Sequence, residues 1–141
     1  MKQEELDIIL ENHGKWLLNE GGERANLSNI DLNGIDLSGS NLERAYLKNT
    51  NLTGANLSNA DLNWINWQSI QGLTAVVVQV DTTRRNNQIT YIKELGIWTT
   101  GCFQGTVYEL RAAVEIAHRH NEKLKKRYYR VIDFILREAE E

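Results

Sequence analysis

Three side chains in the C-terminal half of the sequence could carry nucleophilic or metal chemistry: Cys102, His118 and His120. A thiolate is the reactive form of cysteine, so an enzyme would need Cys102 as nucleophile and one histidine as its base. The histidines are two positions apart and point to different sides of a helix, which makes them poor joint metal ligands. Phe103 beside the cysteine predicts instead that Cys102 is a small buried apolar residue. We expect no catalytic residue, no metal site and no cofactor.

The segment from Gly101 to Thr106 could bind an anion. Gly101 and Gly105 precede Thr106, and Glu109 three residues later completes a reciprocal capping pattern at the start of a helix. Free N–H groups at a helix start attract negative charge. A nucleotide-like ligand could then meet guanidinium and aromatic groups from the neighbouring strands, namely Arg84, Arg85, Tyr91 and Trp98. The plainer and preferred interpretation is that the glycines only permit a tight strand-to-helix turn.

A run of five cations without an intervening carboxylate forms the second candidate surface: Lys123, Lys125, Lys126, Arg127 and Arg130. Next to two tyrosines, such a run could bind phosphates and stack on bases. On a helix these residues spread around several faces, which favours a solvated helix with Tyr128 in the core. The whole chain has 16 Lys and Arg against 19 Asp and Glu, a net charge of -3. Bulk charge therefore argues against direct binding to nucleic acid or to an anionic membrane.

The elements that must position these residues form a small α+β module over residues 71–141. Two β-branched runs, 75–80 and 88–92, predict a hairpin whose loop contains Arg84 and Arg85, and residues 97–100 are compatible with a third strand. A helix is expected from Thr106 through Ala117. After Asn121 a last helix is expected, whose buried stripe contains Leu124, Tyr128, Val131, Ile132 and Ile135.

Residues 25–69 repeat with a period of five. Leucine takes every fifth position and Trp67 takes the last one, in the series Leu27, Leu32, Leu37, Leu42, Leu47, Leu52, Leu57, Leu62 and Trp67. The preceding residue is Asn or Asp in all units except the one with Tyr46, and a small or branched residue lies two positions before each leucine. This period is neither that of a helix nor that of a strand, so only a coil that turns a corner every five residues can bury all the leucines.

This A(N/D)LXX pattern resembles the pentapeptide-repeat family. The resemblance implies a mainly β fold, a short right-handed quadrilateral β-helix with four pentads per coil and about two coils. So short a solenoid has two open ends that need caps. Apolar residues at near-helical spacing predict a capping helix from Glu4 to Asn19, with Gly14 as the point where it could bend; they are Leu6, Ile9, Leu10, Trp16 and Leu17. The expected organisation is a capping helix in 1–24, the β-helix in 25–70 and the C-terminal α+β module in 71–141.

Two segments of the C-terminal module carry a second resemblance. GCFQGT at residues 101–106 and YYRVIDFI at 128–135 resemble a small uncharacterised module of phage and prophage pentapeptide-repeat proteins. This resemblance implies a mobile-element origin and brings no known chemistry. We therefore expect a non-enzymatic, phage-type protein that binds a host protein, such as a component of an antiviral defence or CRISPR system, and inhibits it through protein–protein interaction.

Two other functions stay open at this point. The first is a sponge for a nucleotide-like ligand that uses the Gly101–Thr106 turn. The second is a DNA-mimic inhibitor of a topoisomerase or restriction enzyme, which the resemblance to gyrase-inhibitor pentapeptide proteins suggests. Residues 25–69 hold few charges for a DNA mimic, with Asp31, Asp36, Glu43 and Asp61 against Arg44 and Lys48. Turn geometry alone can explain Asn and Asp before each leucine.

Partner and compartment follow from the same composition. The open ends of a short solenoid favour a homodimer. No run approaches the roughly 18 apolar residues of a membrane span, and the acidic start MKQEELDIILEN does not resemble a signal peptide. A single cysteine fits a reducing compartment. We expect a cytoplasmic protein, in the host cytoplasm if a phage encodes it, with no membrane partner.

Overall fold

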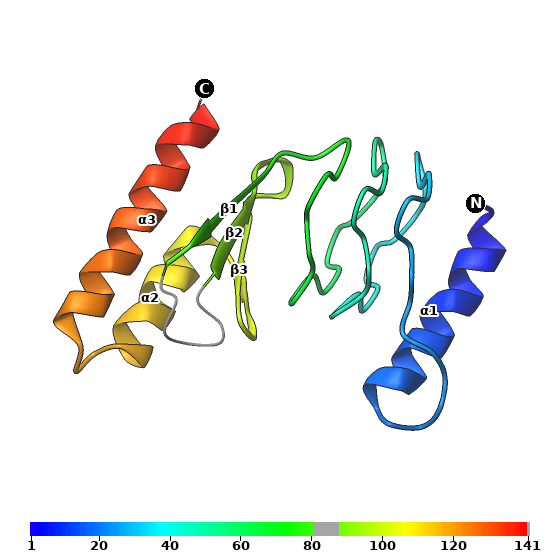
Figure 1. Cartoon of the computed structure of the whole chain (residues 1–141), viewed down its shortest axis with the longest axis horizontal. Helices are drawn as coiled ribbons and strands as arrows, with labels where there is room; N and C mark the ends of the chain where they lie inside the picture. The colour runs from blue at the N-terminus through cyan, green and yellow to red at the C-terminus, as the bar shows by residue number, and fades with distance from the viewer. Residues whose placement is uncertain (81–87, 141) are drawn as a thin grey trace. The chain divides into compact units, whose positions relative to one another are not determined.

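The structure of the chain, a computed structural model, describes residues 1–80 and 88–140. Arg84 and Arg85 lie outside the described residues. Two compact units make up the chain, Met1–Thr74 and Ala75–Glu141. Figure 1 shows helix α1 and a series of coils in the first unit, and a sheet with helices α2 and α3 in the second.

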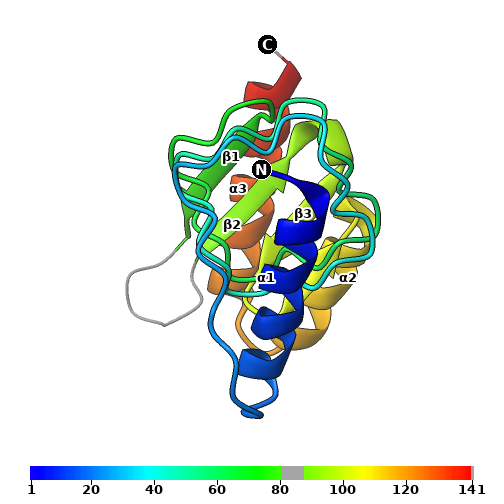
Figure 2. The same ribbon diagram turned by 90° about the vertical axis from the view of Figure 1, so that its right-hand side faces the viewer.

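The coils of the first unit stack with a spacing of twenty residues. Parallel bridges join residues twenty positions apart, in the pairs Asn26–Tyr46, Asp31–Asn51, Asp36–Asn56, Asn41–Asp61 and Asn51–Gln71. Each coil therefore contains four pentads, and Figure 2 shows the coils one behind another. The eight leucines from Leu27 to Leu62 are all at most 2% exposed, so they fill the interior. The repeats form a β-helix-like fold.

Each pentad turns at the second residue after its leucine, which has a left-handed backbone. These residues have φ between 60° and 71° and are Asn29, Gly34, Gly39, Arg44, Asn49, Gly54, Asn59, Trp64 and Ser69. The Asn or Asp before the leucine stabilises the turn, because its Oδ1 accepts a hydrogen bond from the backbone N–H two residues later. Eight pentads have this bond, at 2.9–3.1 Å. The structural explanation of these Asn and Asp residues is thereby confirmed.

Helix α1, Gln3–Leu17, caps the first coil. It runs through Gly14 without interruption and ends two residues before the predicted Asn19. The Gln3 amide donates to the carbonyl oxygen of Asp36 at 2.9 Å and accepts from the Asp36 N–H at 3.1 Å. A preceding coil would have used these two backbone groups, so a side chain substitutes for the missing strand. Leu6 is fully buried on this helix.

The second unit contains one antiparallel sheet in the order β1-β2-β3-β4. Its strands are Ala75–Gln79, Gln88–Ile92, Ile97–Thr100 and Phe103–Gly105, and a short 3-10 helix, Lys93–Leu95, joins β2 to β3. The three predicted strands are confirmed. Strand β4 was not predicted, because a three-residue strand that ends in a glycine carries almost no strand signal.

Helices α2, Val107–Ala117, and α3, Glu122–Glu140, lie on the same face of this sheet (Figure 1). The buried residues of this core come from β2, β3, both helices and the position just after β1: Val80, Ile89, Trp98, Leu110, Val114, Tyr128, Ile132 and Ile135. Within the predicted stripe of α3, Leu124 and Val131 are only half-buried, and Ala117 on α2 is exposed. The three helices hold 15, 11 and 19 residues, so the chain is more helical than the mainly β class that the repeat implied.

Candidate functional site

The two glycines of the predicted anion site serve different structural purposes. Gly101 has φ of 54° and lies in the tight turn between β3 and β4. Gly105 lies within β4, opposite Trp98. A Cβ atom at Gly105 would be 3.0 Å from Cζ of Phe103 and 3.1 Å from Oε1 of Glu109. The close approach of these two side chains explains the second glycine without a ligand.

A carboxylate already occupies the start of helix α2. The backbone N–H of Thr106 donates to Oε1 of Glu109 at 3.0 Å, and the Glu109 N–H donates to Oγ1 of Thr106 at 3.3 Å. The predicted reciprocal cap is thus confirmed. The hydrogen bond from the Thr106 backbone is the main reason why the pKa of Glu109 is lowered. This negative charge lies where a bound anion would approach, which disfavours a phosphate at the Gly101–Thr106 segment.

The two aromatic residues that were predicted to contact a ligand pack against each other instead. Tyr91 on β2 and Trp98 on β3 are paired across the sheet, and their rings stack with centroids 4.4 Å apart. Trp98 is only 1% exposed and belongs to the core, so it cannot stack on a ligand. Tyr91 is half-buried. The predicted ligand set is therefore not brought together among the described residues.

The prediction that Cys102 is buried was wrong. Cys102 is exposed in the turn between β3 and β4. It lines a cavity of about 280 Å³ together with His118, the residue that ends helix α2. The His118 ring stacks on Tyr128 with centroids 4.8 Å apart. His120 is exposed and does not line this cavity. No group of three or more His, Cys, Asp or Glu residues that could hold a metal occurs in the described part of the chain.

The basic run on α3 divides into two sets. Lys125 is half-buried and pairs with Glu122 at 3.0 Å and with Glu115 at 3.1 Å. These two partners, with the hydrogen bond to Glu122 as the larger contribution, raise the pKa of Lys125. Arg127 is also half-buried, and Tyr128 lies in the core as predicted.

The other three cations of the run lie on one exposed face of α3. Lys123, Lys126 and Arg130 are three and four positions apart, and Arg137 follows seven positions later, so all four lie on one side of the helix. No ion pair joins any of them to another described residue. The run as a whole spreads over more than one face, as expected, and these three residues share one of them. We call the four residues the basic stripe.

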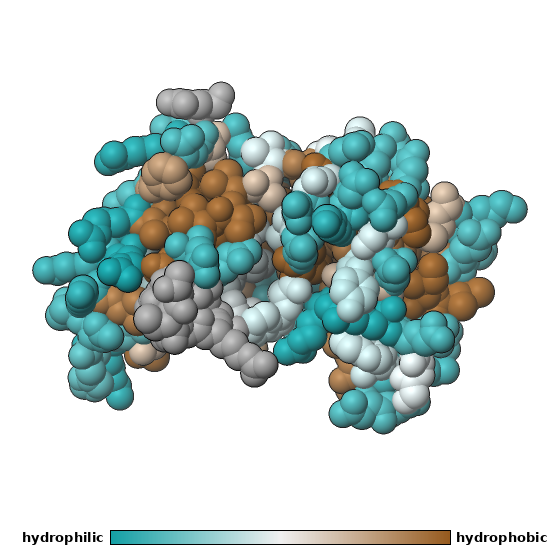
Figure 3. Space-filling view, in the orientation of Figure 1, coloured by the Kyte–Doolittle hydropathy of each residue, from teal (hydrophilic) through white to brown (hydrophobic). Residues whose placement is uncertain are grey.

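Helix α2 turns large apolar side chains away from the core. Tyr108 is 81% exposed and Ile116 is 74% exposed, and Ala112 between them is exposed as well. These residues are four positions apart and share one side of the helix. We call them the outer face of α2. Figure 3 shows further apolar atoms at the surface over β1, where Val77 is 43% exposed.

Hydrogen bonds and ion pairs between side chains join α2 to α3, and we call this set of contacts the polar seam. Glu115 accepts a hydrogen bond from the hydroxyl of Tyr129 and pairs with Lys125, and Arg111 pairs with Asp133 at 3.4 Å. Both helices therefore meet through charged side chains as well as through the core. The outer face of α2 and the basic stripe lie outside this seam.

The carboxylates of the coils do not stack on one another. Asp31 lies beside Asn51, Asp36 beside Asn56, and Asn41 beside Asp61 in the neighbouring coil. The Asn51 amide donates to Oδ1 of Asp31 at 3.1 Å.

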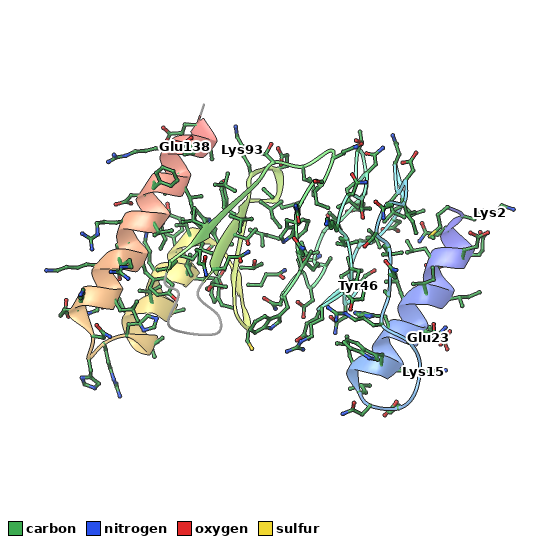
Figure 4. The ribbon with its side chains drawn as sticks, in the orientation of Figure 1. Lys2, Lys15, Glu23, Tyr46, Lys93 and Glu138 are labelled. Carbon is green, nitrogen blue, oxygen red and sulfur yellow. The ribbon has the colours of Figure 1, made fainter. Side chains whose placement is uncertain are left out.

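Tyr46, the exception in the Asn/Asp series, points outward (Figure 4). The guanidinium carbon of Arg24 lies over its ring, 3.9 Å from the ring centroid. The described coils thus present alternating carboxylates and amides rather than the acidic line that a DNA mimic needs.

Comparison with known proteins agrees with the class that these coils define, a β-helix-like repeat. The family Pentapeptide repeats matches residues 24–63 in eight copies. No match was found among curated proteins or among solved structures. No described helix is both long and apolar enough to cross a membrane.

Proposed function

We propose that the chain is a non-enzymatic binding protein that acts by protein–protein contact, with the outer face of α2 and the basic stripe of α3 as its contact surface. The exposure of Tyr108 and Ile116 is the observation that carries this proposal. Leu110 and Val114 form the buried apolar side that holds helix α2 against the core. Packing of the helix therefore does not explain the apolar side chains of Tyr108 and Ile116 on its other side. Large side chains exposed on one helix face are typical of a surface that another protein covers.

The basic stripe defines the charge of the partner. Its four cations extend over fifteen residues, a rise of about 21 Å along the helix at ~1.5 Å per residue. None of them is neutralised by a described carboxylate. A partner must therefore present negative charge. It must also present apolar surface to the outer face of α2, which a phosphate backbone does not do. Tyrosine and arginine are enriched in protein interfaces, so an acidic protein surface fits both parts and nucleic acid fits only the stripe.

The identity of the partner is a further part of this proposal. The resemblance of GCFQGT to a module of phage and prophage proteins supports a host protein, such as a component of an antiviral defence or CRISPR system, as the target that the chain inhibits in the host cytoplasm. The twenty-residue period of the bridges supports a right-handed quadrilateral β-helix of about two coils. A homodimer stays our expectation for the free protein.

The two alternative functions have less support. The carboxylate of Glu109 lies on the amide that a phosphate would use, and the carboxylates of the coils alternate with amides. Neither the ligand sponge nor the DNA mimic is therefore proposed.

A photo-crosslinking residue at position 108 tests the contact surface. The full chain is expressed in bacterial cells with an active CRISPR system, and the same residue at position 8 is the matched control, because Ile8 on α1 is 62% exposed. We expect one adduct of defined mass from position 108 and none from position 8. The adduct should weaken when Lys126→Glu and Arg130→Glu are added. No adduct at position 108, or equal adducts at both positions, would contradict the proposal.

A further inference from the structure

The cavity beside Cys102 lies within the second unit and is formed by three of its elements. The turn between β3 and β4 contributes Cys102, the inner side of α2 contributes Ala113 and Ala117, and α3 contributes Tyr128. The two alanines are four positions apart, so they lie on one side of the helix. Larger residues at these positions would fill the space that the cavity leaves.

The lining of the cavity is more apolar than polar. Phe103, Leu110 and Val114 supply apolar surface, and the polar atoms come from Thr100, Cys102, His118 and Tyr128. Among the described residues, no Asp, Glu, Lys or Arg lines the cavity. A charged ligand would meet no carboxylate, ammonium or guanidinium partner among these residues, which favours a neutral ligand.

The volume of the cavity and the aromatic ring at its wall further limit which ligands can bind. About 280 Å³ is roughly twice the ~150 Å³ cavity that admits benzene. A group of two fused rings therefore fits. The His118 ring, which is half-buried and stacks on the buried Tyr128 ring at an inclination of 22°, offers aromatic surface at one wall. Aromatic pairs favour offset or edge contacts with such a ring.

We propose that this cavity is a binding site for a small, neutral, fused-ring aromatic group of the size of indole. Such a group can belong to a free metabolite or to a tryptophan side chain of a bound peptide. Both sources share the same chemistry, and they differ in whether the free compound alone is bound.

Cys102 provides a reporter for the occupied cavity. It is the single cysteine of the chain, it is exposed, and it lines the cavity. A thiol reagent therefore modifies one known position, and a bound ligand should protect it. At a ligand concentration ten times Kd the free fraction falls to about one-eleventh, so the labelling rate should fall by up to about tenfold.

The test measures the labelling rate of Cys102 and the thermal midpoint of the full chain with indole and with zwitterionic tryptophan. We expect indole to slow labelling and to raise the midpoint, and tryptophan to do neither because of its charges. The variant Ala113→Phe fills the cavity and should abolish both effects. Glu138→Phe is the control, since Glu138 is exposed on α3, does not line the cavity and lies outside the basic stripe, so both effects should remain.

A third ligand, a blocked Gly-Trp-Gly peptide, distinguishes a free metabolite from a tryptophan side chain as the source of the aromatic group. Protection by indole indicates a free small molecule, and protection by the peptide alone indicates a tryptophan side chain. If Ala113→Phe does not fold, Ala117→Leu replaces it, because Ala117 lies at the exposed end of the lining. The proposal is overturned if neither indole nor the peptide protects Cys102 in the wild-type chain, or if the filled variants keep the protection.

Discussion

The Nδ1 atom of His13 accepts a hydrogen bond from the backbone N–H of Ala25 at 3.0 Å. On the other side of the ring, Nε2 lies 2.8 Å from the carbonyl oxygen of Glu43. Because a backbone N–H only donates and a carbonyl only accepts, Nδ1 carries no proton and Nε2 carries one. His13 is thus a neutral imidazole that joins α1 to the first coil, and it is fully buried.

Acid should therefore weaken the first unit. Burial lowers the pKa of His13 below its ordinary value, so the unfolded chain binds a proton that the folded chain rejects. Stability contributed by neutral His13 is full above about pH 6.5 and is lost as the pH falls from there to the lowered pKa of the folded state. An NMR titration of the His13 ring should give a pKa below the ordinary histidine value of about 6.5. An equal or higher pKa would contradict the tautomer deduced from the two hydrogen bonds.

Gly72 should tolerate alanine far less well than Gly39 does. Both have a left-handed backbone, with φ of 89° and 68°. A Cβ at Gly39 meets nothing within 4 Å, whereas at Gly72 it would be 2.4 Å from the backbone nitrogen of Thr53. We expect Gly39→Ala to lower the free energy of unfolding by about 1–2 kcal/mol through backbone strain alone. Gly72→Ala should lower it by at least ~1 kcal/mol more, because backbone has to move. Urea titrations with equal midpoints would show that the close approach is absent.

The cap of α2 should depend on the hydroxyl of Thr106. Replacing an N-cap threonine by alanine leaves the Glu109 N–H without its acceptor and typically costs about 1 kcal/mol. We expect Thr106→Ala to lower the free energy of unfolding by about that amount. Thr106→Ser keeps the hydroxyl, so it should lower the free energy of unfolding much less. Denaturant titration of the full chain checks both variants. A Thr106→Ser variant as unstable as Thr106→Ala would assign the effect to the lost methyl group instead.

The repeat was predictable because its signal is local and redundant. Eight pentads repeat the same leucine, and each Asn or Asp before the central residue closes its own turn within two residues, so each unit predicts its own conformation. The capping box of Thr106 and Glu109 was predictable for the same reason. His13 was not singled out, because its partners Ala25 and Glu43 are set by how α1 packs on the first coil.

The candidate sites were less predictable than the fold. Periodicity correctly predicts that Tyr128 is buried, but it does not say whether Trp98 or Cys102 faces a ligand. Cys102 has an apolar neighbour that suggested burial, and its position in the turn into the unpredicted strand β4 exposes it instead. The cavity depends on three elements that meet only in the folded unit, so no single stretch of sequence marks it.

Charge reversal on α3 should separate cations that hold the fold from cations that are available to a partner. Lys125→Glu places a third carboxylate beside Glu115 and Glu122, so the thermal midpoint of the full chain should fall. Lys126→Glu changes an exposed side chain with no described ion pair, and such surface substitutions usually alter stability by less than about 0.5 kcal/mol. Differential scanning calorimetry at low salt, where charge effects are largest, compares the two variants directly. A fall in midpoint for Lys126→Glu as large as that for Lys125→Glu would mean that the basic stripe stabilises the unit itself, and it would remove the stripe as a surface reserved for an acidic partner.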